Sequence, residues 1–296
     1  MRFKRIARQG IAALLLGCAF CVIPVSAANQ GQYYAIDSEW KYNFPDGASE
    51  VSIEMDGERV LGGEAAIIDS VTYVPLRTFA ELCGVDSISW NERTRVASVQ
   101  DGDTTVKVGD GSYYVEAEGR YFYSPAPARN IDDRIFVPIR IISKALCVEV
   151  DWDADRRTVV LTPTGNVLVS GDKFYNSTDL YWLSRIISAE SAGEPLTGKI
   201  AVGNVVLNRK SSPSYPSTIY GVIFDRKGGT QFTPAVSGTI YKTPTAESIM
   251  AAKICLEGYS LDGKILFFMN PRIATNNWIS KNRPFAFRIA NHDFYY

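Results

Sequence analysis

An internal duplication in the first half of the chain restricts the fold more than any other feature. The stretch "TYVPLRTFAELCGVDSISWNERTRVASV" (72–99) returns as "IFVPIRIISKALCVEVDWDADRRTVVL" (135–161). Three pairs of positions match between the copies: Pro75 and Pro138, Arg77 and Arg140, and, after a one-residue slip, Trp90 and Trp152. Each copy predicts a strand that ends in Val-Pro, a short helix, and a strand led by the tryptophan and closed by alternating residues. The first half is therefore predicted to be a duplicated α+β unit.

Over residues 51–163 the duplicated segment resembles the copper amine oxidase N-terminal-like domain. The marks of that family are Val-Pro-Leu/Ile-Arg and Trp-Asp; Trp152-Asp153 keeps the second mark, whereas Trp90-Asn91 departs from it. The resemblance implies no copper here, because the segment contains no histidine. We interpret its arginines and tryptophans as structural anchors, with ligand binding as the alternative. By analogy, we expect the module to hold the protein in the cell envelope.

The first 27 residues have the organisation of a secretory signal peptide. Four basic residues precede an apolar run from Ile11 to Ile23, which is shorter than the ~20 residues that a bilayer span needs. Small residues at Val25 and Ala27 suit a cleavage site. We therefore predict secretion and no stable membrane span after cleavage. A membrane anchor and lipidation of Cys18 are the alternatives.

Charge and cysteine usage argue against two further classes. The formal net charge is −1, and removal of residues 1–27, with their four basic and no acidic residues, would make it −5. Such a chain is not typical of proteins that bind nucleic acid through its phosphates. Cleavage also leaves three cysteines, Cys83, Cys147 and Cys255. A sparse, odd set does not make a disulfide framework, so we expect mostly buried thiols.

Composition and periodicity divide the chain into five segments. We predict a signal peptide (1–27), a polar lead (28–50), the duplicated module (51–163), a linker (164–178) and a second domain (179–296). For the second domain the patterns predict a first helix capped by Ser177, Thr178 or Asp179 and further helices that begin at Thr197 and Thr243. They also predict a loop and hairpin over 228–241 and a strand over 264–270. That domain should be mainly helical with a small sheet.

One carboxylate, Glu190, continues the apolar stripe of the first of these helices. The stripe consists of Leu180, Leu183, Ile186 and Ile187. A carboxyl group at the end of such a stripe is partly desolvated, which raises its pKa and suits it to act as a general acid. The alternative is an exposed helix-end residue with Lys199 or Arg185 as its partner.

The second half resembles the spore cortex-lytic cell wall hydrolase family of the SleB type. The resemblance spans residues 179–296 and rests on "AES.GEP…G..AV..VVLNR" (189–209), followed by "TQFTP", "GKILFFMNP" and a Trp-rich close. It implies a lysozyme-like fold in which Glu190 is the catalytic acid. Ser188 and Ser191 replace bulkier neighbours of that glutamate. The fold class is then α+β: a duplicated strand-helix-strand module followed by a mainly helical domain with a small sheet.

The reaction that the resemblance implies is lytic transglycosylation of peptidoglycan, with preference for muramic δ-lactam in spore cortex, during germination or sporulation. A glycoside hydrolase normally needs a second carboxylate, whereas in a transglycosylase one glutamate acts first as acid and then as base. We interpret Glu194, Asp225 and Glu247 as turn, loop or helix-cap residues. The expected partners are glycan strands and a regulatory spore envelope protein, with no cofactor or metal, in the cell wall or spore envelope.

Four further residues are candidates for the glycan groove: Gln231, Phe232, Asn270 and Trp278. A sugar presents hydroxyl groups and an apolar face, so its cleft needs amide side chains together with flat rings. The alternative for each residue is core packing, and Asn270 before Pro271 could simply end the strand.

Three other functions compete with glycan cleavage. A zinc amidase normally needs at least two histidines, and the chain has only His292. A cysteine peptidase would have to pair Cys255 with His292, but Cys255 falls on an apolar helix face and is expected to be a buried thiol. The other rival is a non-catalytic wall-binding protein.

Overall fold

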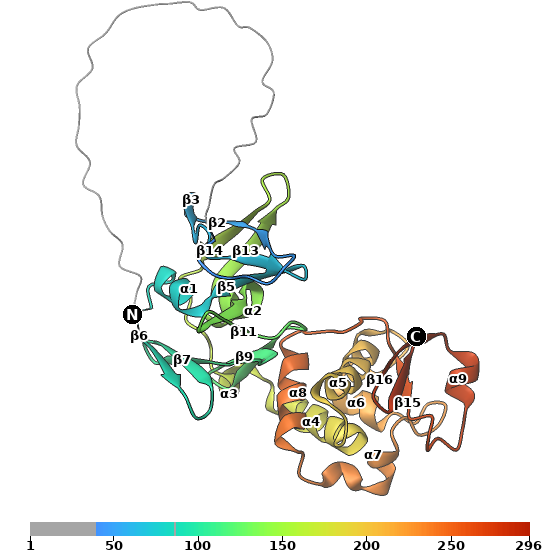
Figure 1. The fold of residues 1–296 in the computed structure, drawn as a ribbon. Coiled ribbons are helices and arrows are strands. Elements are labelled where there is room, and N and C mark those ends of the chain that lie inside the picture. The colour runs from blue at the N-terminus through green and yellow to red at the C-terminus, as the bar shows by residue number, and fades with distance from the viewer. Residues whose placement is uncertain (1–39, 86) are drawn as a thin grey trace, which may run out of the picture.

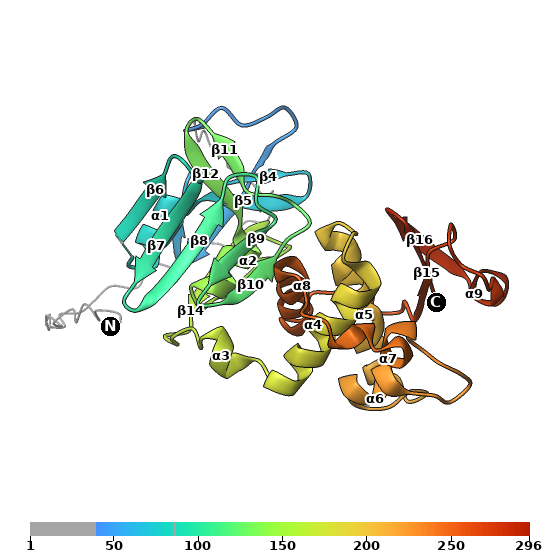
Figure 2. The ribbon, with the colours of Figure 1, turned by 90° about the horizontal axis from the view of Figure 1, so that it is seen from below.

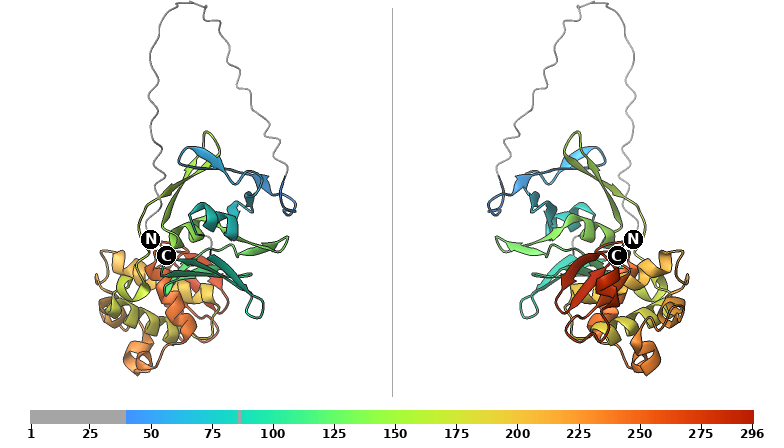
Figure 3. Two further views of the ribbon diagram at one scale, coloured as in Figure 1. Left: turned by 90° about the vertical axis from the view of Figure 1, so that its left-hand side faces the viewer. Right: turned by 90° about the vertical axis from the view of Figure 1, so that its right-hand side faces the viewer.

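The computed structural model describes residues 40–85 and 87–296 as a strand-rich part followed by a mainly helical part (Figure 1). The predicted signal peptide and most of the polar lead lie outside the described residues. Figure 3 shows the helical part, yellow to red, below the sheets of the first part. Within the described ranges, no helix combines the length and apolar character needed to cross a bilayer.

The duplication is confirmed as two matching strand–helix–hairpin units. The first comprises β5 (Val71–Pro75), α1 (Leu76–Leu82), β6 (Ser87–Asn91) and β7 (Val96–Asp101). The second comprises β12 (Arg134–Pro138), α2 (Ile139–Ala145), β13 (Val148–Asp153) and β14 (Thr158–Pro163). β5 and β12 pair antiparallel, with Val74 opposite Val137. The two copies therefore meet through equivalent strands.

The tryptophan of each copy lies in the first strand of a hairpin, and does not lead a single strand as predicted. The residue that follows it makes the turn: the Asn91 side chain accepts a hydrogen bond from the Thr94 N–H (3.0 Å), and Asp153 accepts one from the Arg156 N–H (3.0 Å). In both turns the side-chain oxygen accepts a hydrogen bond from the N–H group three residues later. Asn91 therefore forms the same turn as Asp153, although it departs from the Trp-Asp mark.

Three sheets surround the main hydrophobic core of this part of the chain, and a smaller cluster packs around Tyr73 and Phe136. The central sheet has the order β1 (Ser49–Glu50), β4 (Ala66–Ile68), β5, β12, β11 (Arg129–Ile131). The second has the order β10 (Arg120–Tyr123), β9 (Tyr114–Ala117), β8 (Thr104–Gly109), β7, β6. The third has the order β13, β14, β2 (Ser52–Met55), β3 (Glu58–Val60). Because the two hairpins enter different sheets, the two copies have different surroundings.

The second part is a helical core with a small sheet at one edge, as expected. Its helices are α3 (Gly171–Phe174), α4 (Ser177–Ser191), α5 (Leu196–Ser211), α6 (Ile219–Phe224), α7 (Thr233–Ser237), η1 (Thr239–Tyr241), α8 (Ala246–Leu256) and α9 (Trp278–Asn282). The sheet has the order β15 (Phe267–Met269), β17 (His292–Tyr295), β16 (Phe285–Ile289). Helices α4, α5 and α8 pack against one another around a second hydrophobic core.

Several local predictions for this part were wrong. Of the predicted loop and hairpin over 228–241, the first residues form a loop, but α7 and η1 take the place of the hairpin. Pro234 lies in the first turn of α7, and Gly238 caps its end in the left-handed region (φ 81°). The cap of α4 is Asn176, whose side chain accepts hydrogen bonds from the N–H groups of Thr178 and Asp179 in the first turn. The predicted linker contains α3, and the Gly171 N–H donates to the Glu118 carbonyl (2.8 Å). The linker is therefore packed against the duplicated part.

Gly203 allows α5 to approach both of its neighbouring helices. A Cβ atom there would lie 2.7 Å from Cys255 Sγ in α8 and 2.9 Å from Ile187 Cδ1 in α4. Since neither neighbour is a flexible surface side chain, we expect Gly203→Ala to lower the free energy of unfolding by about 1–3 kcal/mol. Gly263→Ala is the control, because its Cβ would meet nothing within 4 Å. Equal thermal shifts for the two variants would contradict this packing.

Helix α8 joins the two parts of the chain (Figure 2). Arg120 in β10 forms two 2.7 Å hydrogen bonds with the Glu257 carboxylate at the end of α8, and the Tyr175 hydroxyl donates to the same carboxylate (2.6 Å). Lys253 donates to the Gly119 carbonyl (2.8 Å). We call these five residues the junction. The Arg120 and Glu257 side chains are only 12% and 7% exposed, so the ion pair is shielded from water.

Candidate active site

Glu190 lies in the last turn of α4, where the apolar stripe of the helix meets the surface. Leu183, Ile186 and Ile187 are fully buried beneath it, and Glu190 itself is half-buried. Burial raises the pKa of Glu190 from 4.5 to about 7, against the opposite effect of the positive charge of Arg209. A carboxyl group with this pKa holds its proton near neutral pH and can act as a general acid.

Arg209, in the last turn of α5, provides the nearby positive charge. Its side chain is buried, donates to the Leu266 carbonyl (2.7 Å) and contacts three aromatic rings at 5.2–5.4 Å, those of Tyr215, Phe232 and Phe267. The sequence motif contains this arginine, but its function was missed. The signal available was a charged residue on a helix face of otherwise apolar residues.

The structure links Gln231 and Phe232 to this charge. The Gln231 side chain accepts a hydrogen bond from Arg209 (3.4 Å) and donates to the Lys227 carbonyl (3.2 Å). The ring of Phe232 is only 2% exposed and lies 5.2 Å from the Arg209 guanidinium. Phe232 is therefore a core residue that supports Arg209, which corrects its predicted place along the groove, while Gln231 remains a candidate contact.

Asn270 directly follows β15 of the small sheet, and Trp278 is the first residue of α9, which lies at the outer edge of the helical part in Figure 1. The Asn270 side chain accepts a hydrogen bond from the Arg272 N–H (3.0 Å), which matches the strand-ending alternative. Trp278 is 49% exposed, with Arg283 5.3 Å from its ring. Among the described residues, no hydrogen bond or ring contact joins either residue to Glu190 or Arg209.

The other candidate carboxylates have structural partners. Glu194 is buried and accepts hydrogen bonds from the backbone (3.2 Å) and side chain (2.9 Å) of Asn291. Burial alone would raise the pKa of Glu194, but these bonds and nearby positive charges lower it. Glu247 pairs with the buried Lys199 (2.6 Å), and Asp225 accepts from the Lys227 N–H (2.9 Å). Each of the three carboxylates thus has a structural partner, which agrees with their predicted turn, loop and cap roles.

The cysteine and the histidine occupy different surroundings. Cys255 is buried and donates to the Ile200 carbonyl (3.4 Å), and burial raises the pKa of its thiol. This confirms the predicted buried thiol. His292 lies in β17, with its ring 5.4 Å from that of Phe268 and its Nδ1 3.7 Å from Glu194. In the described part of the chain, no three His, Cys, Asp or Glu side chains form a group that could hold a metal ion.

A surface cluster of aromatic rings was also missed by sequence reasoning. Trp182 in α4 contacts Tyr220 (5.3 Å) and Phe224 (5.2 Å) of α6, and Tyr241 (6.1 Å) of η1. Tyr220 and Tyr241 are 51% and 60% exposed. The spacing of Tyr220 and Phe224, one helical turn apart, was the available signal. Exposed rings of this kind provide flat apolar faces for sugars.

Comparison with known proteins divides the chain as the structure does. Residues 193–295 match the family described as Cell Wall Hydrolase, and residues 54–161 match the Copper amine oxidase N-terminal domain. Glu190 lies just before the first of these segments. Neither segment covers half of the chain.

Curated relatives include spore cortex-lytic enzymes of Bacillus cereus (37% identical over 120 residues) and Bacillus subtilis (33% over 120 residues). The matches cover 40% of this chain, and 45% and 38% of those relatives; the chain thus spans less than half their length. A solved structure, the catalytic domain of a germination-specific lytic transglycosylase, SleB, from Bacillus anthracis, is 35% identical. The match covers 44% of this chain and the whole of that structure, with a TM-score of 0.38.

Proposed function

Since this chain is a homologue of spore cortex-lytic enzymes and carries a cell wall hydrolase domain, we propose that it cleaves the glycan strands of peptidoglycan with Glu190 as general acid and base. The observation that supports this role most strongly is the half-buried Glu190 carboxyl group, whose pKa is raised to about 7. We propose lytic transglycosylation after N-acetylmuramic acid, with spore cortex muramic δ-lactam as the preferred context.

In this mechanism the Glu190 carboxyl group gives its proton to the glycosidic oxygen as the bond to the anomeric carbon breaks. The 6-hydroxyl of the same muramic acid then attacks that carbon, and the Glu190 carboxylate accepts its proton. The product is a 1,6-anhydro sugar, and the enzyme regains its starting state without water. The positive charge of Arg209 stabilises the carboxylate that exists between the two steps.

The partners of the other carboxylates support the use of a single glutamate. Glu194 and Glu247 are bonded to Asn291 and Lys199 respectively, and Asp225 makes a loop hydrogen bond. Hydrolysis remains the closest alternative chemistry, in which water takes the place of the 6-hydroxyl. We further propose that the protein is secreted to the cell wall or spore envelope and that a spore envelope protein regulates it.

We expect digestion of purified cortex and vegetative peptidoglycan to yield glycan ends that carry anhydro-muramic acid, read by mass spectrometry of the fragments. New reducing ends would instead indicate a hydrolase, and release of stem peptides an amidase. A protein that binds the wall and releases nothing would favour the non-catalytic alternative. Comparison of the two wall types tests the cortex preference directly.

A further inference from the structure

A hollow of about 610 Å³ lies in the strand-rich part, away from Glu190. It is lined by the β6–β7 hairpin, the first residues of α1 and the turn between β11 and β12. Its lining includes Arg77 at the start of α1, Trp90 in β6, and Arg134 at the start of β12. Two sheets and a helix therefore contribute one mixed polar and aromatic surface.

The guanidinium groups of Arg77 and Arg134 are available to a ligand. The carboxylate that pairs with Arg77 is that of Glu81, at the long distance of 3.9 Å and with both side chains about half exposed. The hydrogen bond of Arg134 within the described chain goes to the Asp133 carbonyl (3.1 Å). Exposed pairs at such distances contribute little energy, so a carboxylate ligand can compete for both groups.

Trp90 provides the flat apolar face of the same hollow. Its side chain is 38% exposed, so part of the indole ring is open to solvent. Carboxylates of Glu92 and Asp133 also line the hollow, so its charge is mixed and not purely basic. A ligand that suits this surface has a flat sugar face and a peptide that carries a carboxylate together with an amino group.

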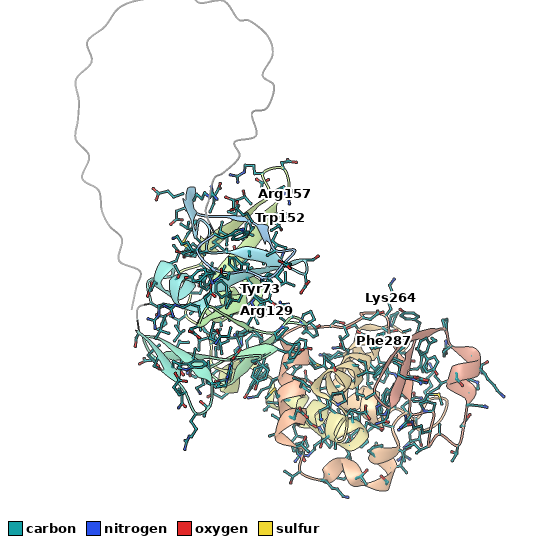
Figure 4. All side chains as sticks on the ribbon, viewed as in Figure 1. Tyr73, Arg129, Trp152, Arg157, Lys264 and Phe287 are labelled. Atoms are coloured by element: carbon teal, nitrogen blue, oxygen red, sulfur yellow. The ribbon has the colours of Figure 1, made fainter. Side chains whose placement is uncertain are left out.

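The set of residues obtained by exchanging the two copies lacks this combination. Trp152 and Arg140 are the equivalents of Trp90 and Arg77, and neither lines the hollow. Figure 4 shows Trp152 on the β13–β14 hairpin, far from the helical part. At the position equivalent to Arg134 the chain has Val71. The hollow therefore combines Arg77 and Trp90 of the first copy with Arg134 of the second, whereas the exchanged set of Arg140, Trp152 and Val71 has only one arginine.

We propose that this hollow binds peptidoglycan through one sugar ring, which stacks on Trp90, and through the carboxylate of its stem peptide, which pairs with Arg77 and Arg134. The assignment rests on the proposed function, because peptidoglycan is the substrate that supplies both groups on one molecule. The junction packs the strand-rich part, which contains this binding site, against the helical part. The strand-rich part thereby retains the enzyme on the polymer that it cleaves.

The test measures binding by isothermal titration calorimetry to the full chain with Glu190→Gln, which prevents cleavage. The probes are a disaccharide-tetrapeptide, the free tetrapeptide, and chitotetraose, which has no carboxylate. We expect Trp90→Ala and, separately, Arg77→Ala and Arg134→Ala to weaken disaccharide-tetrapeptide binding at least about tenfold. Trp152→Ala and Arg140→Ala, the matched controls, should change it by less than about twofold. Trp90→Phe keeps a ring and should recover most of the affinity.

Three outcomes would overturn the proposal: equal losses for Trp90→Ala and Trp152→Ala, no loss for Trp90→Ala, or binding of chitotetraose or tetrapeptide as tight as that of the complete fragment. Thermal unfolding of each variant checks that the fold persists. The proposed function is read separately, by anhydro-muramic products from the chain with native Glu190. If anhydro-muramic products form but the variants do not show this binding pattern, only the proposal that the hollow binds peptidoglycan fails. If the binding pattern is found but no such products form, only the cleavage proposal fails.

Discussion

Glu190→Gln is expected to abolish glycan cleavage while the fold persists. Glutamine matches the size of glutamate and can stay in the same half-buried place, but it cannot give a proton to the glycosidic oxygen or take one back. Loss of a general acid and base corresponds to a decrease in turnover of roughly 10²–10⁴-fold. Release of soluble fragments from purified peptidoglycan measures this loss, and near-UV circular dichroism checks the fold.

Asp225→Asn is the matched control for this experiment, because Asp225 is the other carboxylate whose charge acts on Arg209. With one catalytic glutamate, this variant should keep turnover within about threefold of the original protein. Normal cleavage by the Glu190→Gln variant, or equal inactivity of the Asp225→Asn variant, would contradict the single-glutamate mechanism.

The pH dependence gives a second readout of the same carboxyl group. The general acid must be protonated, so turnover should fall as pH rises through about 7. The raised pKa also means that the folded state binds this proton more tightly than the unfolded state. The resulting stability is fully present below pH 4.5 and is lost as pH rises through about 7. Glu190→Gln should remove this component from the stability–pH curve, and an unchanged curve would argue against a buried acid.

Arg120→Ala is expected to weaken the junction strongly. It leaves the Glu257 carboxylate, only 7% exposed, without its charged partner and with the Tyr175 hydroxyl as the remaining side-chain donor. Removing one partner of a buried ion pair lowers stability by about 3–5 kcal/mol. We expect calorimetry to show separate unfolding of the two parts at a lowered temperature, while turnover on short soluble fragments persists.

The exposed pair of Arg77 and Glu81 serves as the comparison, since Glu81→Ala should change stability by less than about 1 kcal/mol. The double variant Arg120→Met with Glu257→Leu should recover part of the loss, because it leaves no unpaired charge. A single variant, Arg120→Ala, that unfolds as the original protein does would show that the ion pair contributes little to the junction.

Several features could be predicted because their signals are local. The matching Val-Pro and Trp positions predicted two equivalent units, because nearby proline and polar residues determine where strands and helices begin and end. The spacing of Leu183, Ile186 and Ile187 predicted the buried face of α4 and the partial burial of Glu190. The hairpin predicted within 228–241 was the local error, because Pro234 lies in the first turn of α7 and Gly238 is its C-cap.

Other features depend on contacts between residues far apart in the chain. No local pattern pairs Arg120 with Glu257, brings Arg209 within electrostatic range of Glu190, or combines Trp90 with Arg134 in one hollow. The two repeat copies have nearly the same local signals, and their hairpins nevertheless enter different sheets. Periodicity and turn residues determine which face of an element is buried, because they act over a few residues. Only the packing of whole elements determines which charges and rings meet. It placed Arg209 near Glu190, packed α8 against β10, and put Trp90, but not Trp152, in the wall of the 610 Å³ hollow.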